Sequence, residues 1–239
     1  MILFYVRHGD PIYNPDSLTP LGHRQAEAVA KRLALYGVDR IFASTSNRAM
    51  QTAQPTCEIL KKDMTTLDFA NESHAFADFS VELEPGKRTW VFSEPKMRAI
   101  LASAEVRNMG DRWTEHPLLA EFHFEKGVQR VQRETDAFIA SLGYERVPGT
   151  GSYRAVAPND DRVALFAHQG FGMSFLSAVL GISYPMMSMH FDMSHTGMTA
   201  IHFREEADGF ARPCVMTLSN DSHLYREGLP TKYGNQYYF

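Results

Sequence analysis

Residues 2–9 read ILFYVRHG, an apolar run that ends on a cation, an imidazole and a glycine. Five consecutive apolar residues, 2–6, are typical of a strand buried on both faces of a parallel sheet. A second run of this kind, RVALFA at 162–167, is followed by a histidine and a glycine as well, at His168 and Gly170. Each of the two predicted interior strands therefore ends next to a histidine.

Helix signals follow the first predicted strand. Thr19 can cap a helix, Pro20 suits its first position, and Gly37 is expected to end it. Residues 39–44 then predict a strand and 48–62 a helix that Pro55 should kink or interrupt. Strand and helix in alternation favour parallel pairing through right-handed crossovers. We therefore expect an α/β fold, a three-layer α/β/α sandwich with a mostly parallel central sheet.

Length, composition and net charge limit the classes of protein to which this chain can belong. A chain of 239 residues, 44% hydrophobic, suits a single domain, 1–239, and its irregular stretch at about 77–126 predicts an insertion or cap. A net charge of −4 argues against nucleic-acid and anionic-membrane partners. Two cysteines, no membrane-length apolar run and no signal-peptide pattern predict a cytoplasmic location. A homodimer is left open.

The strand ends predict a site. In open α/β sheets ligands bind at the carboxyl ends of the strands, so His8 and His168 should face each other across one pocket. Arg7 and Arg48 offer planar forks that match phosphate oxygens. A neutral histidine with one ring nitrogen held by an acceptor is a good nucleophile toward phosphorus. Such a site could transfer a phosphoryl group without a metal or cofactor, given a carboxylic acid to protonate the leaving oxygen.

Four segments, taken in order, resemble the histidine phosphatase superfamily, the phosphoglycerate mutase-like proteins with an RHG motif. The segments are RHG at 7–9, LTPLGHRQA at 18–26, STSNRAMQTA at 44–53 and FAHQG at 166–170. The resemblance implies a phosphoglycerate mutase-like fold, with His8 as the nucleophile that becomes phosphohistidine. It also implies a set of phosphate-binding residues: Arg7, Arg48, His168 and, from positions that match less closely, Asn14 and Gln169. Thr45 and Ser46 depart from the family's Pro-Leu pair, and Gln169 replaces a glycine.

The general acid has two candidates. Glu72, in NESH at 71–74, follows Arg48 at about the distance at which the family's acid follows its second arginine. Glu121, in LLAEFHFEKG, has a similar local context. We expect Glu72 to be the acid and keep Glu121 as the alternative.

The expected function is hydrolysis of a small phosphorylated metabolite through phosphohistidine, with inorganic phosphate or the substrate as ligand. One alternative is phosphoglycerate mutase-type transfer within the substrate, and another is a non-catalytic phospholigand-binding protein. His195 could line the pocket mouth or serve the structure. The basic residues of 77–126 are interpreted as a solvated face, and Trp90 and Trp113 as anchors of that insertion.

Overall fold

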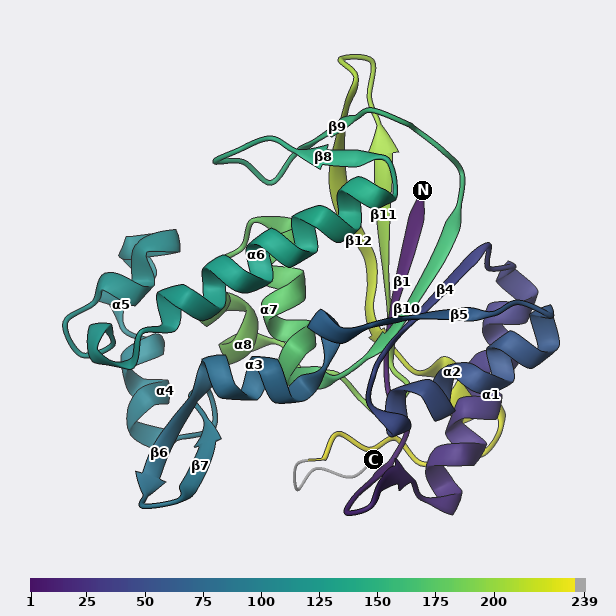
Figure 1. Ribbon diagram of the computed structural model, residues 1–239, viewed down its shortest axis with the longest axis horizontal. Coiled ribbons are helices and arrows are strands. Elements are labelled where there is room, and N and C mark those ends of the chain that lie inside the picture. Colours follow the sequence, from purple (N-terminus) through teal and green to yellow (C-terminus); the bar gives the residue numbers. More distant parts are fainter. Residues whose placement is uncertain (235–239) are drawn as a thin grey trace.

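The computed structural model describes residues 1–234. An eight-stranded sheet runs through the molecule, with helices on both faces (Figure 1). The strand order is β5-β4-β10-β1-β11-β12-β9-β8. The strands are β1 (Ile2–Arg7), β4 (Arg40–Ser44), β5 (Met64–Leu67), β8 (Tyr144–Arg146), β9 (Tyr153–Ala155), β10 (Arg162–Ala167), β11 (Met198–Glu205) and β12 (Phe210–Asn220).

One half of this sheet is parallel and the other is antiparallel. Strands β5, β4, β10 and β1 pair in parallel, whereas β11, β12, β9 and β8 extend the sheet by antiparallel pairings. The expectation of a mostly parallel sheet is therefore wrong. The reason is local, because short connections join β8 to β9 and β11 to β12, and a short connection can only reverse the chain direction.

The three-layer α/β/α arrangement is confirmed. Alternate residues of β1 point to opposite faces: Leu3 and Tyr5 join one hydrophobic core, and Phe4 and Val6 join the other. The helices α1 (Pro20–Tyr36) and α2 (Asn47–Leu60) cover the Phe4 face, and α6 (Phe124–Ser141) and α7 (Gln169–Leu180) cover the Leu3 face (Figure 1). Burial on both faces explains why residues 2–6 of β1 are all apolar.

The helix signals act as predicted at α1. Thr19 is the N-cap, its hydroxyl oxygen accepts a hydrogen bond of 3.0 Å from the N–H of Gly22, and Pro20 is the first helical residue. Gly37 ends the helix with a φ of 74°, a conformation that favours glycine. Pro55 does not end the second helix, because α2 runs on both sides of it.

The stretch 77–126 is ordered and shares the main core. After α3 (Glu72–Phe79) come a hairpin and two short helices: β6 (Ser80–Glu84), β7 (Lys87–Trp90), α4 (Pro95–Leu101) and α5 (Ala104–Met109). Two 3₁₀ turns, Gly110–Glu115 and Ala120–Phe122, lead into α6. The indole of Trp113 stacks on Phe124 and on Tyr184 of α8 (Tyr184–His190), with ring centroids 5.6 and 5.7 Å apart. Trp113 thus anchors this stretch to the helices behind the sheet.

Three short elements complete the chain: β2 (Pro11–Tyr13), β3 (Asp16–Leu18) and α9 (Ser222–Arg226), with a 3₁₀ turn at Asp68–Ala70. Strands β2 and β3 form a hairpin directly after the RHG segment. Across residues 1–234, none of the helices combines the length and apolarity that a bilayer crossing requires.

Candidate active site

The carboxyl ends of three parallel strands meet at one edge of the sheet. Arg7 on β1 is in register with Ala167 on β10, and Phe166 is in register with Ala43 on β4. The residues that follow these positions, His8, His168 and Ser44, therefore come together. The rings of His8 and His168 lie with centroids 5.2 Å apart, and the expected facing histidines are present.

His8 is held in the state that a nucleophile requires. Its Nδ1 lies 2.7 Å from the carbonyl oxygen of Gly9. Because a carbonyl only accepts, Nδ1 carries the proton and Nε2 keeps its lone pair. Burial of the ring, together with the nearby His168 and Arg7, holds the pKa of His8 well below its usual range. The imidazole is therefore neutral, with Nε2 as its reactive nitrogen.

Gly9 is fixed by a close approach of two backbones. Its N–H donates to the hydroxyl oxygen of Thr52 on α2 at 3.0 Å. A Cβ added at Gly9 would lie 2.6 Å from the carbonyl oxygen of Gly22 in α1, a separation that real side chains do not reach. The glycine therefore lets the segment after His8 lie against the first turn of α1.

Two guanidinium groups flank His8. The Nη1 of Arg48 donates to Oδ1 of Asp16 at 2.6 Å. Arg7 donates from Nη1 to the carbonyl oxygens of Met193 and Tyr233, and from Nη2 to Nε2 of His195.

The Nε atoms of both Arg7 and Arg48 are buried and have no hydrogen-bond partner among residues 1–234. A buried N–H without an acceptor costs about 1–3 kcal/mol. An anion held between the two guanidinium groups would remove this cost, so the pair is suited to a phosphoryl group.

Glu72 adjoins His168. It lies in the first turn of α3, where the Asn71 side chain caps the helix by accepting from the N–H of Ser73. Its Oε1 accepts from the N–H of Gly170 at 2.9 Å, and its Oε2 lies 3.3 Å from Nδ1 of His168. That Oε2 is buried and makes no hydrogen bond with the described part of the chain. One carboxyl oxygen is thus anchored while the other is available.

The other ring nitrogen of His168 also has a partner. Its Nε2 lies 2.8 Å from the hydroxyl oxygen of Ser44, and its backbone oxygen accepts from the hydroxyl of Tyr5 at 2.6 Å. Burial, with contributions from Arg48 and Arg7, holds the pKa of His168 well below its usual range. A neutral imidazole fixed in this way can orient Glu72 and a phosphoryl oxygen without adding charge.

A cavity of about 660 Å³ opens over these groups, a usual size for a small-molecule site. Its lining is Arg7, His8, Tyr13, Asp16, Thr45, Ser46, Asn47, Arg48, Asn71, Glu72, Ser73, Phe76, Trp90 and Gln169. Of the predicted site residues, the cavity brings together Arg7, His8, Arg48, Glu72 and Gln169, with His168 buried beside them.

Two predicted site residues lie elsewhere. Asn14 is exposed at the turn between β2 and β3 and is not among the lining residues, because Tyr13 and Asp16 form the last pair of that hairpin and leave Asn14 at its tip. The phosphate contact expected of Asn14 stays a prediction. Glu121 lies on the exposed 3₁₀ turn Ala120–Phe122, outside the cavity. Of the two carboxyl candidates, only Glu72 lines the cavity and contacts His168.

Sequence reasoning left His195 undecided and missed Asp10. The buried ring of His195 lies 5.8 Å from that of His8, and burial, Arg7 and Lys232 lower the pKa of His195 to about 2. Its Nε2 can therefore accept from Arg7, while its Nδ1 lies 3.4 Å from Oδ1 of Asp10. His195 does not follow a strand of the parallel half, so the search for polar residues at the ends of predicted parallel strands could not find it. The same search could have found Ser44, which ends the predicted strand 39–44.

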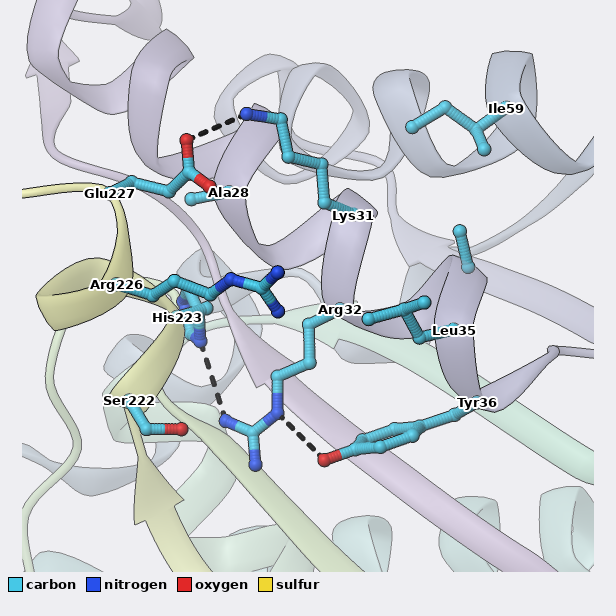
Figure 2. A pocket seen from close by; sticks show the side chains of 11 residues that line it. Ala28, Lys31, Arg32, Leu35, Tyr36, Ile59, Ser222, His223, Arg226 and Glu227 are labelled. Carbon is cyan, nitrogen blue, oxygen red and sulfur yellow. Dashed lines mark hydrogen bonds and ion pairs between the residues drawn. The ribbon is translucent and has the colours of Figure 1, made fainter.

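A separate pocket of about 480 Å³ lies between α1 and α9 (Figure 2). Arg32 crosses it, donating to the hydroxyl of Tyr36 at 3.1 Å and lying 3.5 Å from Nδ1 of His223 (Figure 2). None of the predicted site residues lines it. Its buried His223 nevertheless contacts Thr196 at 3.0 Å, and the N–H of Thr196 donates to the carbonyl oxygen of His8.

Within residues 1–234, no group of three or more His, Cys, Asp or Glu side chains is arranged to hold a metal ion. The cationic lining of the cavity comes from the two arginines.

Part of the chain resembles a known protein family. Residues 3–79 match the model of the histidine phosphatase superfamily (branch 1). No curated protein matches the chain.

Solved structures share the fold. A phosphoserine phosphatase mutant from Entamoeba histolytica, in complex with phosphoserine, is 17% identical, with a TM-score of 0.59 over 93% of this chain and 98% of its own. An alpha-ribazole phosphatase from Shigella flexneri is 17% identical, with a TM-score of 0.58 over 92% and 97%. A mycobacterial glucosyl-3-phosphoglycerate phosphatase is 19% identical, with a TM-score of 0.57 over 91% and 98%. At these identities the likeness concerns the fold.

The matched segment 3–79 contains Arg7, His8, Arg48 and Glu72, the groups that meet in the cavity. The remaining sheet and helices, which bring His168 to the same place, complete the fold shared with these solved structures. Over residues 3–79 the chain is similar to the histidine phosphatase superfamily (branch 1), and its fold as a whole is that of the solved phosphatases.

Proposed function

We propose that this protein is a hydrolase that cleaves a small phosphate monoester through a phosphohistidine intermediate on His8, without a metal ion. One observation carries the proposal: His8 has its Nδ1 proton bound to Gly9 and its Nε2 unprotonated, in a cavity that it shares with Arg7, Arg48 and Glu72. This is the combination of nucleophile, charge neutralisation and proton donor that phosphoryl transfer to nitrogen needs.

In the first step, Nε2 of His8 attacks phosphorus, a P–N bond forms, and the P–O bond to the alcohol breaks. The guanidinium groups of Arg7 and Arg48 neutralise the equatorial oxygens. The protonated carboxyl of Glu72 gives its proton to the leaving oxygen, so that a neutral alcohol departs. The Oε2 of Glu72, which makes no hydrogen bond in residues 1–234, is the atom suited to this transfer.

In the second step, a water molecule attacks the phosphorus of phosphohistidine. The Glu72 carboxylate takes a proton from that water, a P–O bond forms, and the P–N bond breaks. Inorganic phosphate leaves, and both His8 and Glu72 return to their starting states, so the cycle is balanced.

Hydrolysis is favoured over mutase-type transfer by the charges of the cavity. Arg7 and Arg48 are its only cationic lining side chains within the described chain, and Arg48 is paired with Asp16. A phosphoglycerate would need a further cation for its carboxylate. The three solved structures described above are each named as a phosphatase, which supports the same choice. An intact nucleophile, acid and pair of arginines argue against a purely ligand-binding role.

We also propose that the protein acts in the cytoplasm. Both of its cysteines, Cys57 and Cys214, are free thiols, which agrees with a reducing compartment. Cell fractionation with an antibody to the protein tests this location.

The proposal predicts release of phosphate from p-nitrophenyl phosphate by the wild-type protein, with and without EDTA. His8→Ala should lower turnover by at least about 10⁴-fold, because no other group replaces the nucleophile. His190→Ala, at an exposed histidine at the end of α8, is the matched control and should leave the rate unchanged. Full activity in His8→Ala would refute the mechanism, and loss of activity in EDTA would refute metal independence.

A further inference from the structure

On the side of Glu72, the wall of the active-site cavity is aromatic. Trp90 of β7 and Phe76 of α3 both line the cavity, and their ring centroids are 5.1 Å apart with planes at 81°. Behind them the buried Phe92 stacks on Trp90 at 5.3 Å. These packed rings form one continuous aromatic surface, here called the aromatic wall, defined by Trp90 and Phe76.

The aromatic wall lies directly beside the proton donor. A Cβ added at Gly170 would collide with the indole of Trp90 and would lie 2.5 Å from Oε1 of Glu72. The indole and the carboxylate therefore converge on the same glycine at the start of α7. In a substrate complex, the oxygen that Glu72 protonates must lie within hydrogen-bond reach of it. The carbon group attached to that oxygen then extends along Trp90 and Phe76.

Within residues 1–234, no lysine or arginine other than Arg7 and Arg48 lines the cavity. Arg7 and Arg48 belong to the phosphoryl end, and Arg48 is already paired with Asp16. Two basic residues of 77–126 have partners of their own: Arg88 donates to Ser80 at 2.8 Å, and Arg98 donates to the carbonyl oxygen of Phe92 at 2.8 Å. Neither of these lines the cavity. A carboxylate on the leaving group would instead lie close to the carboxyl of Glu72.

We infer that the substrate is a phosphate monoester whose alcohol carries an aromatic or heteroaromatic ring and no second anionic group, with the ring seated on the aromatic wall. The inference rests on the proposed function, because it uses Glu72 as the donor to the leaving oxygen. An aromatic ring gains from offset-stacked or edge-to-face contact with Trp90 and Phe76 beyond its apolar area. An alkyl group of equal size gains the area alone.

Four primary-alcohol phosphates with similar leaving groups separate these effects. We expect kcat/KM for 2-phenylethyl phosphate to exceed that for 2-cyclohexylethyl phosphate by about fivefold. We expect kcat/KM for butyl phosphate to exceed that for 3-carboxypropyl phosphate by about tenfold or more, since burial of an unpaired carboxylate is costly. Equal values within the first pair, or a preference for the carboxylated ester, would overturn the inference.

Variants connect the preference to the aromatic wall. Phe76→Leu and Trp90→Leu should each reduce the phenyl-over-cyclohexyl ratio to about twofold or less, while His8-dependent hydrolysis continues. Tyr225→Leu, at a fully exposed ring on α9, is the matched control and should keep the wild-type ratio. A thermal melt identifies a variant that fails to fold. Because the two leucine variants alter different elements, one folded variant is enough to test the role of the aromatic wall. An unchanged ratio in a folded variant would overturn the assignment to the aromatic wall.

Binding of non-hydrolysable analogues separates this inference from the proposed function. Calorimetry with 3-phenylpropylphosphonate and 3-cyclohexylpropylphosphonate measures the same preference without turnover. Phosphate release from all four esters with no aromatic preference would refute the inference and leave the phosphatase function intact. Tighter binding of the phenyl phosphonate without hydrolysis of any ester would refute the function and retain the ligand class. Equal binding of both phosphonates would refute the ligand class.

Discussion

The backbone N–H of Gly170 donates a hydrogen bond of 2.9 Å to Oε1 of Glu72. Gly170 follows the second histidine of the site by two residues, and Glu72 starts a helix 98 positions earlier in the chain. This bond ties the proposed proton donor to the segment that carries His168. It leaves Oε2 as the carboxyl oxygen that can exchange a proton with the substrate.

Removal of the proton from Glu72 should separate the two candidate acids. We expect Glu72→Gln to lower kcat by roughly 10²–10⁴-fold, because an amide cannot protonate the leaving oxygen. Glu121→Gln is the matched control, since that side chain lies on an exposed turn outside the cavity, and its kcat should equal that of the wild type. Steady-state hydrolysis of an alkyl phosphate measures both, and a larger loss at Glu121 would reverse the assignment.

Gly170→Ala should damage activity as well as stability. The new methyl group would meet the Trp90 indole and Oε1 of Glu72, and we expect kcat/KM to fall at least tenfold as both are displaced. Such overpacking also costs about 1–3 kcal/mol of stability. Gly127→Ala is the control, because its Cβ would lie 2.6 Å from Asp78, and neither of these residues lines the cavity. It should lower the melting temperature without changing kcat, and a wild-type kcat in Gly170→Ala would contradict this account.

Asp16 competes with phosphate for Arg48. The two side chains are 2.6 Å apart, and Asp16 itself lines the cavity. We expect Asp16→Asn to tighten the binding of inorganic phosphate by about fivefold, because a negative charge next to the anion is removed and Arg48 is released. Competitive inhibition by phosphate measures this. Asp208→Asn, in a comparable pair with Arg212 on the surface, is the control. Weaker phosphate binding in Asp16→Asn would mean that Asp16 positions Arg48.

Stability should fall as the pH drops below about 6.5. Burial lowers the pKa of His8, His168 and His195, and it lowers the pKa of His223 to about 4. Between the unfolded pKa of about 6.5 and these lower folded values, the unfolded chain binds protons that the folded chain excludes, so acid favours unfolding. Each such histidine contributes a slope of up to about 1.4 kcal/mol per pH unit.

Urea unfolding at pH 7.5, 6.5 and 5.5 measures this slope. The free energy of unfolding should decline gently between pH 7.5 and 6.5, where the histidines of the unfolded chain begin to bind protons, and more steeply toward pH 5.5. His195→Gln, which removes one of the buried imidazoles, should show a shallower decline. A free energy that stays constant down to pH 5.5 would contradict the neutral, buried state of these rings.

The parallel half of the fold and the residues at its strand ends could be predicted because local sequence determines them. Ile2–Arg7 is apolar at nearly every position because both of its faces are buried. The hydrogen bond that Thr19 accepts marks the start of α1, and the backbone conformation of Gly37 marks its end. The antiparallel half was not distinguished, because an apolar strand has the same appearance whichever way its neighbour runs.

Contacts set by long-range packing could not be predicted. His195 comes near Arg7 only because β11 returns antiparallel beside β1, and Trp90 comes near Glu72 only because the β6–β7 hairpin packs beside α7. The position of Asn14 could not be predicted either, because the β2–β3 hairpin that leaves this side chain at an exposed turn was not foreseen from the sequence.

The most direct measurement is a rapid-quench experiment with a ³²P-labelled phosphate monoester. We predict that the wild-type protein, quenched in alkali within the first turnover, carries phosphate in an acid-labile and base-stable bond on the peptide that contains His8. His8→Ala should carry none, and Glu72→Gln should still form the adduct, at a reduced rate. Undiminished turnover with no phosphate on the protein at any time, or an equal adduct in His8→Ala, would contradict the central claim.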